Sequence, residues 1–439
     1  MGREVVEQIL QFNQGRIADR LQAKYAAMAI DPFTFLRGTC HLFYQDLPPD
    51  AGFSQAPVVW SCGDLHLQNF GTFRGDDRIV YFDINDFDEA VLAPCTWDLV
   101  RFLTGVLVTA HSLGIKDDDA EALCQIFLQA YTAALATGKP RNIHRETAIG
   151  MVDELLTTLR ERKSKQFLRD RLCPAGSRHK RSGRKGSAKG TRLKLIPQKT
   201  SPTRPEEQRW VTHLIQSNLA TQPELAHWFA EGEILDIVHR WAGNSSLGLE
   251  RYLILLRDRS GDRSLLDLKA ARPSCVAPHL AIHQPNWTSE AERIVQIQTR
   301  VQEAPPALLH SLTPPEQTLG HDRDHHTQPS QILGSQVVDS YVLRELQPTE
   351  DKIDLRLTHG KPKRLAKVIR TMAEVTAWGQ LRSGGRQGSA IADTLIDFAR
   401  EAPTWQAIVL QYARHYAEQV ETDYQIFHTA WQKGLPTFK

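Results

Sequence analysis

The sequence predicts an α+β fold with two lobes. Apolar residues recur at helical spacing towards both ends of the chain, whereas residues 232–274 form three strand-like runs separated by two turns, as in an antiparallel meander. The 439 residues also exceed the usual length of one compact unit. Since 41% of the residues are hydrophobic and 24% are charged, close to globular averages, a fibrous or largely disordered chain is excluded.

In the N-terminal part, residues 1–30 contain no proline and predict helix, and Asp31 with Pro32 ends that helix and starts another. Short β-branched runs at 58–61 and 79–84 lie on either side of a polar loop. The other predicted elements are a helix from Leu123 to Gly138, a basic loop at 174–206, a helix opened by Ser289, a loop at 305–335, a strand at 337–346, and helices at 362–381 and 390–430.

The composition narrows the class of protein. A net charge of only +2 argues against a protein that coats nucleic acid. Charged residues stand where a signal peptide needs an apolar run, and no apolar stretch is long enough to span a bilayer. The six cysteines form no C-x-x-C pair, so the sequence indicates neither a zinc site nor a disulfide framework. We therefore expect a cytoplasmic protein without membrane or nucleic-acid partners.

The polar loop "GDLHLQNF" and the following "NDFDEA" carry side chains suited to phosphate chemistry. Asp64 is the candidate base, and the amide oxygen of Asn69 is a candidate metal ligand. Asp86, with Asp88 as second choice, would bridge a metal to phosphate. His66 either orients the loop by hydrogen bonds or takes part in the chemistry. The alternative is a polar turn between two strands.

The meander carries candidates for binding phosphates. Gly243 and Gly248, with Ser245 between them in "GNSSLG", would let a hairpin backbone approach phosphate oxygens. Lys269, at the end of the third run, would supply a cation. Each pattern is weak alone, because paired glycines usually mark a turn and a lysine that ends a strand usually faces solvent. Together with the polar loop they supply the parts that phosphoryl transfer needs.

These stretches resemble known motifs. "GDLHLQNF" and "DFDEAVLAPCTWDL" resemble the G-D-x-H-x-x-N and I-D-[FW] motifs of aminoglycoside phosphotransferases and choline kinases, which have the protein-kinase-like fold. "DPFTFLRG", "DIVHRWAGNSSLG", "LLDLKAA", "YVLRELQP" and "RSGGRQGSAIADTLIDFA" look like successive blocks of the uncharacterised bacterial proteins grouped as domain of unknown function 2252. This second resemblance covers nearly the whole chain.

The resemblance to the kinase-like proteins implies a role for individual residues. It makes Asp64 the catalytic-loop aspartate, Asn69 its metal-binding asparagine and Asp86 the metal aspartate. It also makes Asp98, in "WDL", the buried aspartate that anchors the catalytic loop.

The chain departs from the family pattern next to the lysine. Ala270 follows Lys269 where the family has a glutamate, so the acidic partner of the lysine has to come from elsewhere. Glu290 and Glu292, in the following helix, are the residues offered for that role.

The order of the parts requires a circular permutation. A kinase chain runs from the glycine loop and the lysine to the catalytic loop, whereas here Asp64 precedes the glycine turn. Such a change is tolerated where the chain ends fall at exposed places. The predicted organisation is residues 1–165 as the catalytic-loop part of a helical lobe, 166–231 as a basic loop with linker helices, 232–346 as a β-rich nucleotide-binding lobe, and 347–439 as the remainder of the helical lobe.

The predicted function is an ATP- and Mg²⁺-dependent phosphotransferase that acts on a hydroxyl group of a small molecule or a protein. Arg37 is expected near the catalytic loop, because Phe33 and Phe35 beside it would pack there. Nucleotidyl transfer by the same parts, and a nucleotide-binding scaffold without catalysis, stay open. A two-metal phosphoesterase is disfavoured, because its downstream G-D-x-x-D and G-N-H-[DE] motifs do not occur in the sequence.

Two further charged segments have alternative interpretations. The basic loop at 174–206 is either an electrostatic patch for a phosphate-bearing partner or a solvated surface loop. "HDRDHH" at 321–326 could hold a metal, but its Pro- and Gln-rich surroundings favour a solvated turn.

Overall fold

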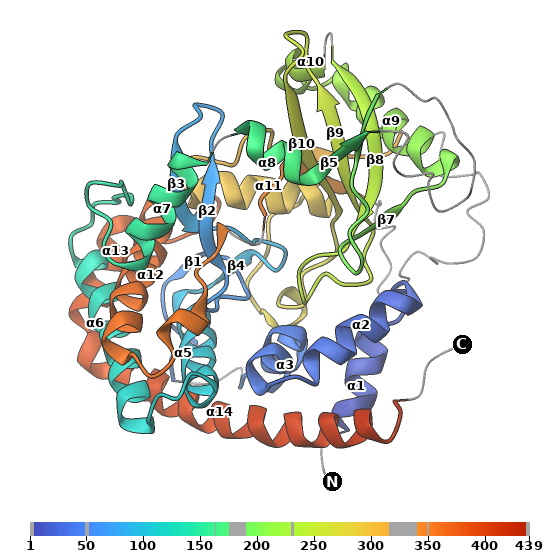
Figure 1. The fold of residues 1–439 in the computed structure, drawn as a ribbon. Coiled ribbons are helices and arrows are strands. Elements are labelled where there is room, and N and C mark those ends of the chain that lie inside the picture. Colours follow the sequence, from blue (N-terminus) through green and yellow to red (C-terminus); the bar gives the residue numbers. More distant parts are fainter. Residues whose placement is uncertain are drawn as a thin grey trace.

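Figure 1 presents the fold as a computed structural model, which describes residues 4–48, 52–162, 164–174, 190–229, 232–315, 340–348 and 351–435. Its mixture of helices and strands confirms the predicted α+β class. The helices are α1 (Val5–Phe12), α2 (Ala18–Met28), α3 (Pro32–Gly38), α4 (Cys40–Asp46), α5 (Cys95–Ser112), α6 (Asp117–Ala136), α7 (Met151–Glu161), α8 (Ser164–Arg171), α9 (Pro205–Leu219), α10 (Pro223–Phe229), α11 (Glu290–Val301), α12 (Pro362–Ser383), α13 (Ala392–Arg400) and α14 (Ala402–Gln432). The strands are β1 (Val58–Ser61), β2 (Phe70–Arg74), β3 (Val80–Ile84), β4 (Val91–Pro94), β5 (Leu172–Pro174), β6 (Thr191–Leu193), β7 (Thr200–Pro202), β8 (Glu233–Arg240), β9 (Arg251–Arg257), β10 (Arg263–Ala270), β11 (His310–Leu312) and β12 (Tyr341–Glu345).

An antiparallel six-stranded sheet is formed by the middle of the chain, with the strand order β11-β12-β10-β9-β8-β7. Its strands β8, β9 and β10 confirm the predicted meander. Side chains of β9 alternate between the two faces, as a strand requires. Tyr252, Ile254 and Leu256 are buried in the apolar cluster that includes residues of α9 and α10. Leu253 and Leu255 belong to a separate cluster on the opposite face.

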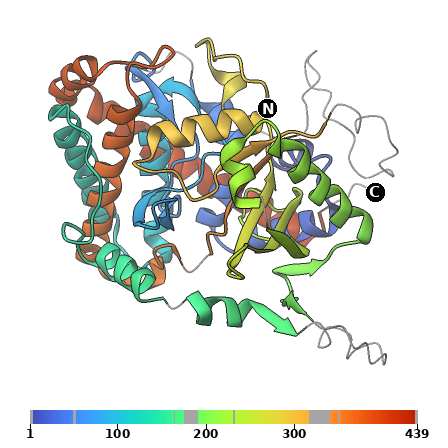
Figure 2. The same cartoon turned by 90° about the horizontal axis from the view of Figure 1, so that it is seen from above.

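The rest of the chain builds a helical region around the largest apolar core. Helix α5 lies within this core and is buried continuously from Cys95 to Val106. Phe102 of α5 stacks on Phe127 of α6, with the ring centroids 4.1 Å apart. Figure 1 shows the long helix α14 running along the edge of this region, in contact with α5, α1 and α3. In the view from above in Figure 2, the sheet with its helices α9 and α10 lies to one side of α6 and α12.

The sheet is inserted between two parts of the helical region. The chain leaves the helical region after α7 and returns to it after β12, and α11, between β10 and β11, packs both on the sheet and on α12. Arg162, directly after α7, forms a two-pronged ion pair with Asp351, which follows β12. The two connections therefore lie side by side.

Two predicted helix starts are confirmed by their caps. The Asp31 carboxylate accepts a hydrogen bond from the Thr34 backbone N–H at 2.7 Å and begins α3. The Ser289 hydroxyl accepts one from the Glu292 N–H at 3.1 Å and begins α11.

Other predicted boundaries are wrong. The single helix predicted for 390–430 is two helices, because Pro403 in the first turn of α14 has no N–H to donate and cannot continue α13. Residues 1–30 likewise form two helices, separated at Gly15, whose φ of +76° ends a helix. The predicted loop at 305–335 contains strand β11 in its described part. Residues 175–189 of the basic loop, and the "HDRDHH" segment, lie outside the described residues.

The polar loop is held between two small pairs of strands. β1 pairs with β4, and β2 pairs with β3, so the loop leads from β1 directly into the β2–β3 hairpin. At its start, Gly63 has φ +80°, a region that favours glycine. A side-chain carbon at Gly63 would overlap the carbonyl oxygen of Glu89. The absence of a side chain thus lets the loop lie directly against the segment that carries Asp86 and Asp88.

We expect Gly63→Ala to lower the free energy of unfolding by about 2–5 kcal/mol, because the left-handed backbone disfavours alanine and the new methyl group overlaps the Glu89 carbonyl. Gly261→Ala is the matched control, since Gly261 has a similar φ of +83° but no heavy atom within 4 Å of the added carbon. It should cost about 1 kcal/mol. Urea denaturation of both variants measures the difference, and equal costs would contradict the close approach.

Candidate functional site

The polar loop is anchored by Asp98 in the first turn of α5. Its carboxylate accepts hydrogen bonds from the backbone N–H groups of Cys62, at 3.0 Å, and Gly63, at 3.1 Å. Burial raises the pKa of Asp98, whereas a side-chain hydrogen bond from Ser61 and these two backbone N–H groups oppose that rise. These contacts confirm the predicted anchor and fix the backbone immediately before Asp64.

Asp64 is joined to the same helix by an ion pair. The Nε and Nη2 atoms of Arg101, which is fully buried, both donate to Asp64 Oδ1, at 3.0 and 2.9 Å. Burial lowers the pKa of Arg101, but the Asp64 carboxylate outweighs that effect and holds it above its usual range. Burial raises the pKa of Asp64, and Arg101 opposes the rise. One carboxylate oxygen is therefore fixed, while Oδ2 takes no hydrogen bond within the described part of the chain.

Asn69 is oriented by hydrogen bonds to the backbone of the polar loop. Its Nδ2 donates to the carbonyl oxygen of Asp64 at 2.8 Å, and its own N–H donates to the carbonyl oxygen of His66. Since the amide nitrogen is fixed in this way, the amide oxygen Oδ1 points to the other side. That oxygen has no hydrogen-bond donor among the described residues, so it is free to act as a metal ligand.

Asp86 lies after β3 and is surrounded by cations without pairing with one. No hydrogen bond or ion pair of its carboxylate occurs within the described ranges. Burial raises the pKa of Asp86, but the charges of Lys269, Lys352 and Arg344 outweigh it and lower the pKa below its usual value. The carboxylate therefore stays ionised in a strongly positive environment. Asp86 and Asp64 are close enough for each charge to act on the other.

Lys269 of β10 forms an ion pair with Asp88. The hydroxyl group of Ser246 lies 3.4 Å from the same carboxylate oxygen. The predicted partners Glu290 and Glu292 are wrong. Glu290 pairs with Arg293 one turn along α11, and the Glu292 carboxylate accepts hydrogen bonds from Thr288. These local partners hold both carboxylates on α11. Asp88, which sequence analysis placed as a second-choice metal ligand, is thus occupied by the lysine.

The glycine turn between β8 and β9 rests on the N-terminal helices. Gly243 and Gly248 have φ of +83° and +89°, conformations that favour glycine. The carbonyl oxygen of Ser245 accepts a hydrogen bond from Arg16 at 2.6 Å, and Asn244 Nδ2 donates to the carbonyl oxygen of Thr34 at 2.8 Å. The turn therefore bridges the sheet and α1–α3, above the segment that carries Asp88.

A second group of side chains lies beside the polar loop. Arg37 donates to the side-chain oxygen of Gln68 at 2.7 Å, and its Nε lies 3.3 Å from His66 Nε2. His66 Nδ1 accepts from the Gln68 N–H at 3.1 Å, and burial, with the charges of Arg37 and Lys352, holds the pKa of His66 well below its usual value. The neutral ring supports the loop backbone, which favours the orienting role. Arg37 lies beside the polar loop, as predicted from its neighbours.

Sequence analysis missed three cations of the site. Arg101 could have been noticed, since a charge three residues after Asp98 on an otherwise apolar helix lies on the same face. Lys352 donates to the carbonyl oxygen of Gln68 at 2.9 Å, and Arg344 donates to that of Asn85 at 3.2 Å. No local motif marks Lys352 or Arg344, because only the fold brings them to the loop.

The residues that could hold a metal are few. The described residues contain no group of three or more His, Cys, Asp or Glu side chains placed to bind an ion. Mg²⁺ does not need one, because proteins commonly hold it through one or two carboxylates together with phosphate oxygens and water. Asp86 and the Asn69 amide oxygen fit that donor set.

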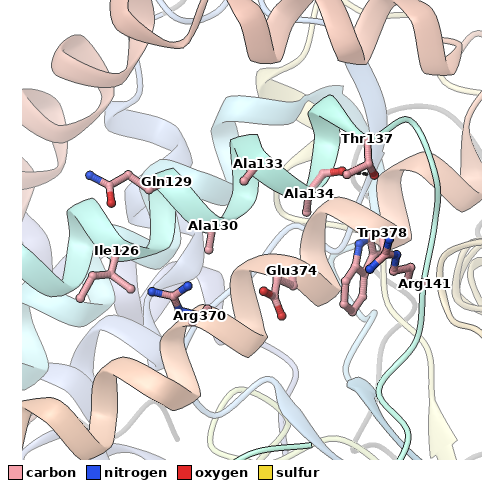
Figure 3. Close-up of a pocket in the computed structure, with 10 residues that line it drawn as sticks. All are labelled: Ile126, Gln129, Ala130, Ala133, Ala134, Thr137, Arg141, Arg370, Glu374 and Trp378. Carbon is pink, nitrogen blue, oxygen red and sulfur yellow. Dashed lines mark hydrogen bonds between the residues drawn. The ribbon is translucent and has the colours of Figure 1, made fainter. Parts of the chain in front are cut away.

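A groove of about 390 Å³ lies elsewhere, between α6 and α12 (Figure 3). Arg370, Glu374 and Trp378 of α12 line it together with Arg141 and small residues of α6. None of its lining residues belongs to the polar loop, the glycine turn or the surroundings of Asp86. The candidate site is therefore assigned from its chemistry and contacts, not from this groove.

Comparison with known proteins gives a family without an assigned activity. A family described as "Uncharacterized protein conserved in bacteria (DUF2252)" matches residues 16–430. No curated protein and no solved structure matches the chain. No helix in the described part of the chain is both long and apolar enough to cross a bilayer.

Two substitutions should separate the carboxylates of the site by their effect on stability. Asp64→Asn should lower the free energy of unfolding by about 3 kcal/mol, because it leaves the buried Arg101 without its counter-charge. Asp86→Asn should cost about 1 kcal/mol or less, since the Asp86 carboxylate has no direct partner in the described structure. Chemical denaturation of both variants measures this, and a larger cost for Asp86→Asn would refute the assignment of Asp86 as an unpaired ligand.

Proposed function

We propose that this chain, which belongs to the bacterial family described as uncharacterized protein conserved in bacteria (DUF2252), is an ATP- and Mg²⁺-dependent phosphotransferase. The observation that carries the proposal is the environment of Asp86. An ionised, unpaired carboxylate surrounded by Lys269, Lys352 and Arg344 suits a metal–phosphate complex, because the metal takes the carboxylate and the cations take the phosphate oxygens.

The order of elements around the sheet supports a kinase-like fold. A glycine turn joins β8 to β9, the lysine lies on the next strand β10, and helix α11 follows, as in the nucleotide lobe of protein kinases. The catalytic loop comes earlier in the chain than these parts, so the proposal includes a circular permutation. The ion pair between Lys269 and Asp88 replaces the lysine–glutamate pair of kinases.

Each residue has a role in this proposal. Asp64 positions the acceptor hydroxyl and accepts its proton at Oδ2, since Oδ1 is held by Arg101. Asn69 and Asp86 hold Mg²⁺, which when bound neutralises charge on the phosphates. Lys269 and the backbone of the glycine turn hold the phosphates. To do so, Lys269 has to break its ion pair with Asp88 and pair with the phosphate oxygens instead.

A nucleotide-binding scaffold without catalysis is the second candidate. The observation in its favour is that Lys269 is already paired with Asp88 while the glycine turn contacts α1–α3. If these contacts persist with nucleotide bound, the phosphates would not reach Asp64. No phosphoryl group would then be available for transfer to the acceptor hydroxyl.

The first test is thermal unfolding with ATP, with and without Mg²⁺. A ligand present at about a hundred times its dissociation constant adds roughly 2.7 kcal/mol, which raises the melting temperature of a chain of this size by a few degrees. We expect this shift for the wild type with Mg²⁺ and its loss in Lys269→Ala. Asp86→Asn should lose the part of the shift that depends on Mg²⁺.

The outcomes of this test distinguish the two candidates. A metal-dependent shift that needs both Lys269 and Asp86 supports the phosphotransferase. A shift that is the same with and without Mg²⁺ favours the scaffold, because the site would then hold nucleotide without the metal. If no nucleotide changes the melting temperature, both proposals fail.

Lys352 gives the binding of Mg²⁺–ATP a pH dependence. Burial lowers the pKa of Lys352 to about 8, although the Asp86 carboxylate opposes this. Its ammonium group is charged below that pH and attracts phosphate, and it loses the charge above it. We therefore expect affinity to fall between about pH 7 and about pH 9, in line with the lowered pKa.

Isothermal titration of the wild type and Lys352→Met at several pH values measures this effect. The variant should bind more weakly at about pH 7 and show little further loss up to about pH 9. An unchanged pH profile in Lys352→Met would show that another group causes the dependence.

A further inference from the structure

Two cations under the glycine turn have no role in the function proposed above. Arg16 precedes α2, and Lys24 lies on that helix. Lys24 is completely buried, with a solvent exposure of 0%. Both side chains come from the helical region, whereas Lys269 comes from the sheet. They therefore form a separate group from the cations around Asp86.

Their hydrogen bonds are with neutral oxygens, and both cations also lie over the Phe12 ring, with Arg16 Cζ 5.8 Å and Lys24 Nζ 6.0 Å from its centroid. Arg16 Nη1 donates to the carbonyl oxygens of Ser245 and Leu247, at 2.6 and 2.9 Å. Lys24 Nζ donates to Asn13 Oδ1 at 2.8 Å and lies 3.5 Å from the Ser245 carbonyl oxygen. No carboxylate lies within ion-pair distance of Arg16 or Lys24 among the residues that the structure describes.

Placing a fully buried lysine beside a partly buried arginine, without a carboxylate paired to either, is unfavourable. Burial, together with Arg272 nearby, lowers the pKa of Arg16 to about 10, although Glu89 opposes this. Burial, with Arg16 beside it, holds the pKa of Lys24 well below its usual value, and the charges of Glu89 and Asp64 only partly oppose this. An oxyanion between the two side chains would supply the missing charge. Buried ion sites of this kind are stable when every charge is paired.

The two cations lie directly beneath the glycine turn. The carbonyl oxygen of Gly248 accepts a hydrogen bond from the Ile17 N–H at 3.1 Å, so the segment between α1 and α2 forms the wall of the site below the turn. Glu89 acts on the charge of both cations, Asp64 acts on that of Lys24 and Asp88 on that of Arg16. The contacts therefore place the pair at the glycine turn.

We propose that Arg16 and Lys24 form an oxyanion site beneath the glycine turn, which takes a phosphate or carboxylate group. The oxyanion site depends only on the contacts of Arg16 and Lys24. Whether its anion belongs to the acceptor or to the nucleotide rests on the proposed function, and the second arm of the experiment separates these two sources. The glycine turn has to lift from α2 to admit the anion, because Lys24 is covered completely.

The test uses the full chain and two simple probes, inorganic phosphate and acetate, at constant ionic strength. Thermal unfolding is followed for the wild type, Lys24→Met, Arg20→Met and Lys269→Met. Arg20 lies on the same helix as Lys24 but stacks on Trp241, so Arg20→Met is the control for loss of a cation from α2. Arg16→Met replaces Lys24→Met if the latter does not fold.

We expect at least one probe to raise the melting temperature of the wild type by a few degrees at saturation. Lys24→Met should lose this shift, whereas Arg20→Met and Lys269→Met should keep it. The probe that acts identifies the anion as phosphate or carboxylate. Without any probe, Lys24→Met should melt no lower than the wild type, because removal of a buried charge that has no carboxylate partner offsets the lost hydrogen bond to Asn13. A purely structural lysine would give a lower melting temperature and no effect of the probes.

A second arm repeats the measurement with Mg²⁺ and a non-hydrolysable ATP analogue at saturation. If the anion belongs to the acceptor, the probe adds its shift to that of the nucleotide. Loss of the probe's shift would assign Arg16 and Lys24 to the nucleotide phosphates. No shift by either probe, or an equal shift in Lys24→Met, would overturn the oxyanion site itself. A shift that depends on Lys24 without any nucleotide binding would leave the oxyanion site and remove the phosphotransferase.

Discussion

The geometry of the candidate site depends on two charged residues of one buried helix. The Asp98 carboxylate accepts hydrogen bonds from the backbone N–H groups of Cys62 and Gly63. Arg101, one turn later, donates to the carboxylate of Asp64. Both residues are almost completely buried, so neither can leave its partner without exposing an uncompensated charge to the apolar core. The position of the polar loop is therefore fixed by the packing of α5, which in turn lies between α6 and α14.

The charges of the site are distributed unevenly, and this asymmetry has a chemical meaning. Asp64 forms an ion pair with Arg101. Asp86 has no such partner in the described structure, although the charges of several lysine and arginine side chains act on it. An excess of positive charge at a half-buried place favours the binding of an anion there. Two such excesses occur in the described structure, one around Asp86 and one under the glycine turn.

Sequence analysis found what local motifs encode. The α+β class, the meander, and the caps at Asp31 and Ser289 follow from spacing and residue type within short segments. The anchor Asp98 followed from its motif. The partner of Lys269 could not be found in this way, because Asp88 is 181 positions away in the sequence. Lys352 lies 284 positions from Gln68 of the polar loop, and its part in the site depends entirely on the tertiary fold.

The errors of sequence analysis also have physical causes. The break between α13 and α14 was visible as Pro403, but the apolar face continued across it and favoured one helix. Lys24 lies on a helix of mixed composition, where a lysine is normally solvent-exposed. Nothing in the local sequence distinguishes a buried lysine from an exposed one, so the cations under the glycine turn became visible only through their contacts.

The contacts between the sheet and the helical region limit how these parts can move. Two chain segments lie side by side, joined by Arg162 and Asp351. Helix α11 adds a third link, because it packs on α12 of the helical region and on β11 and β12 of the sheet. A rotation of the whole sheet away from the helical region would have to break this packing. We therefore expect a ligand to enter under the glycine turn through a local displacement of the segment that joins β8 to β9.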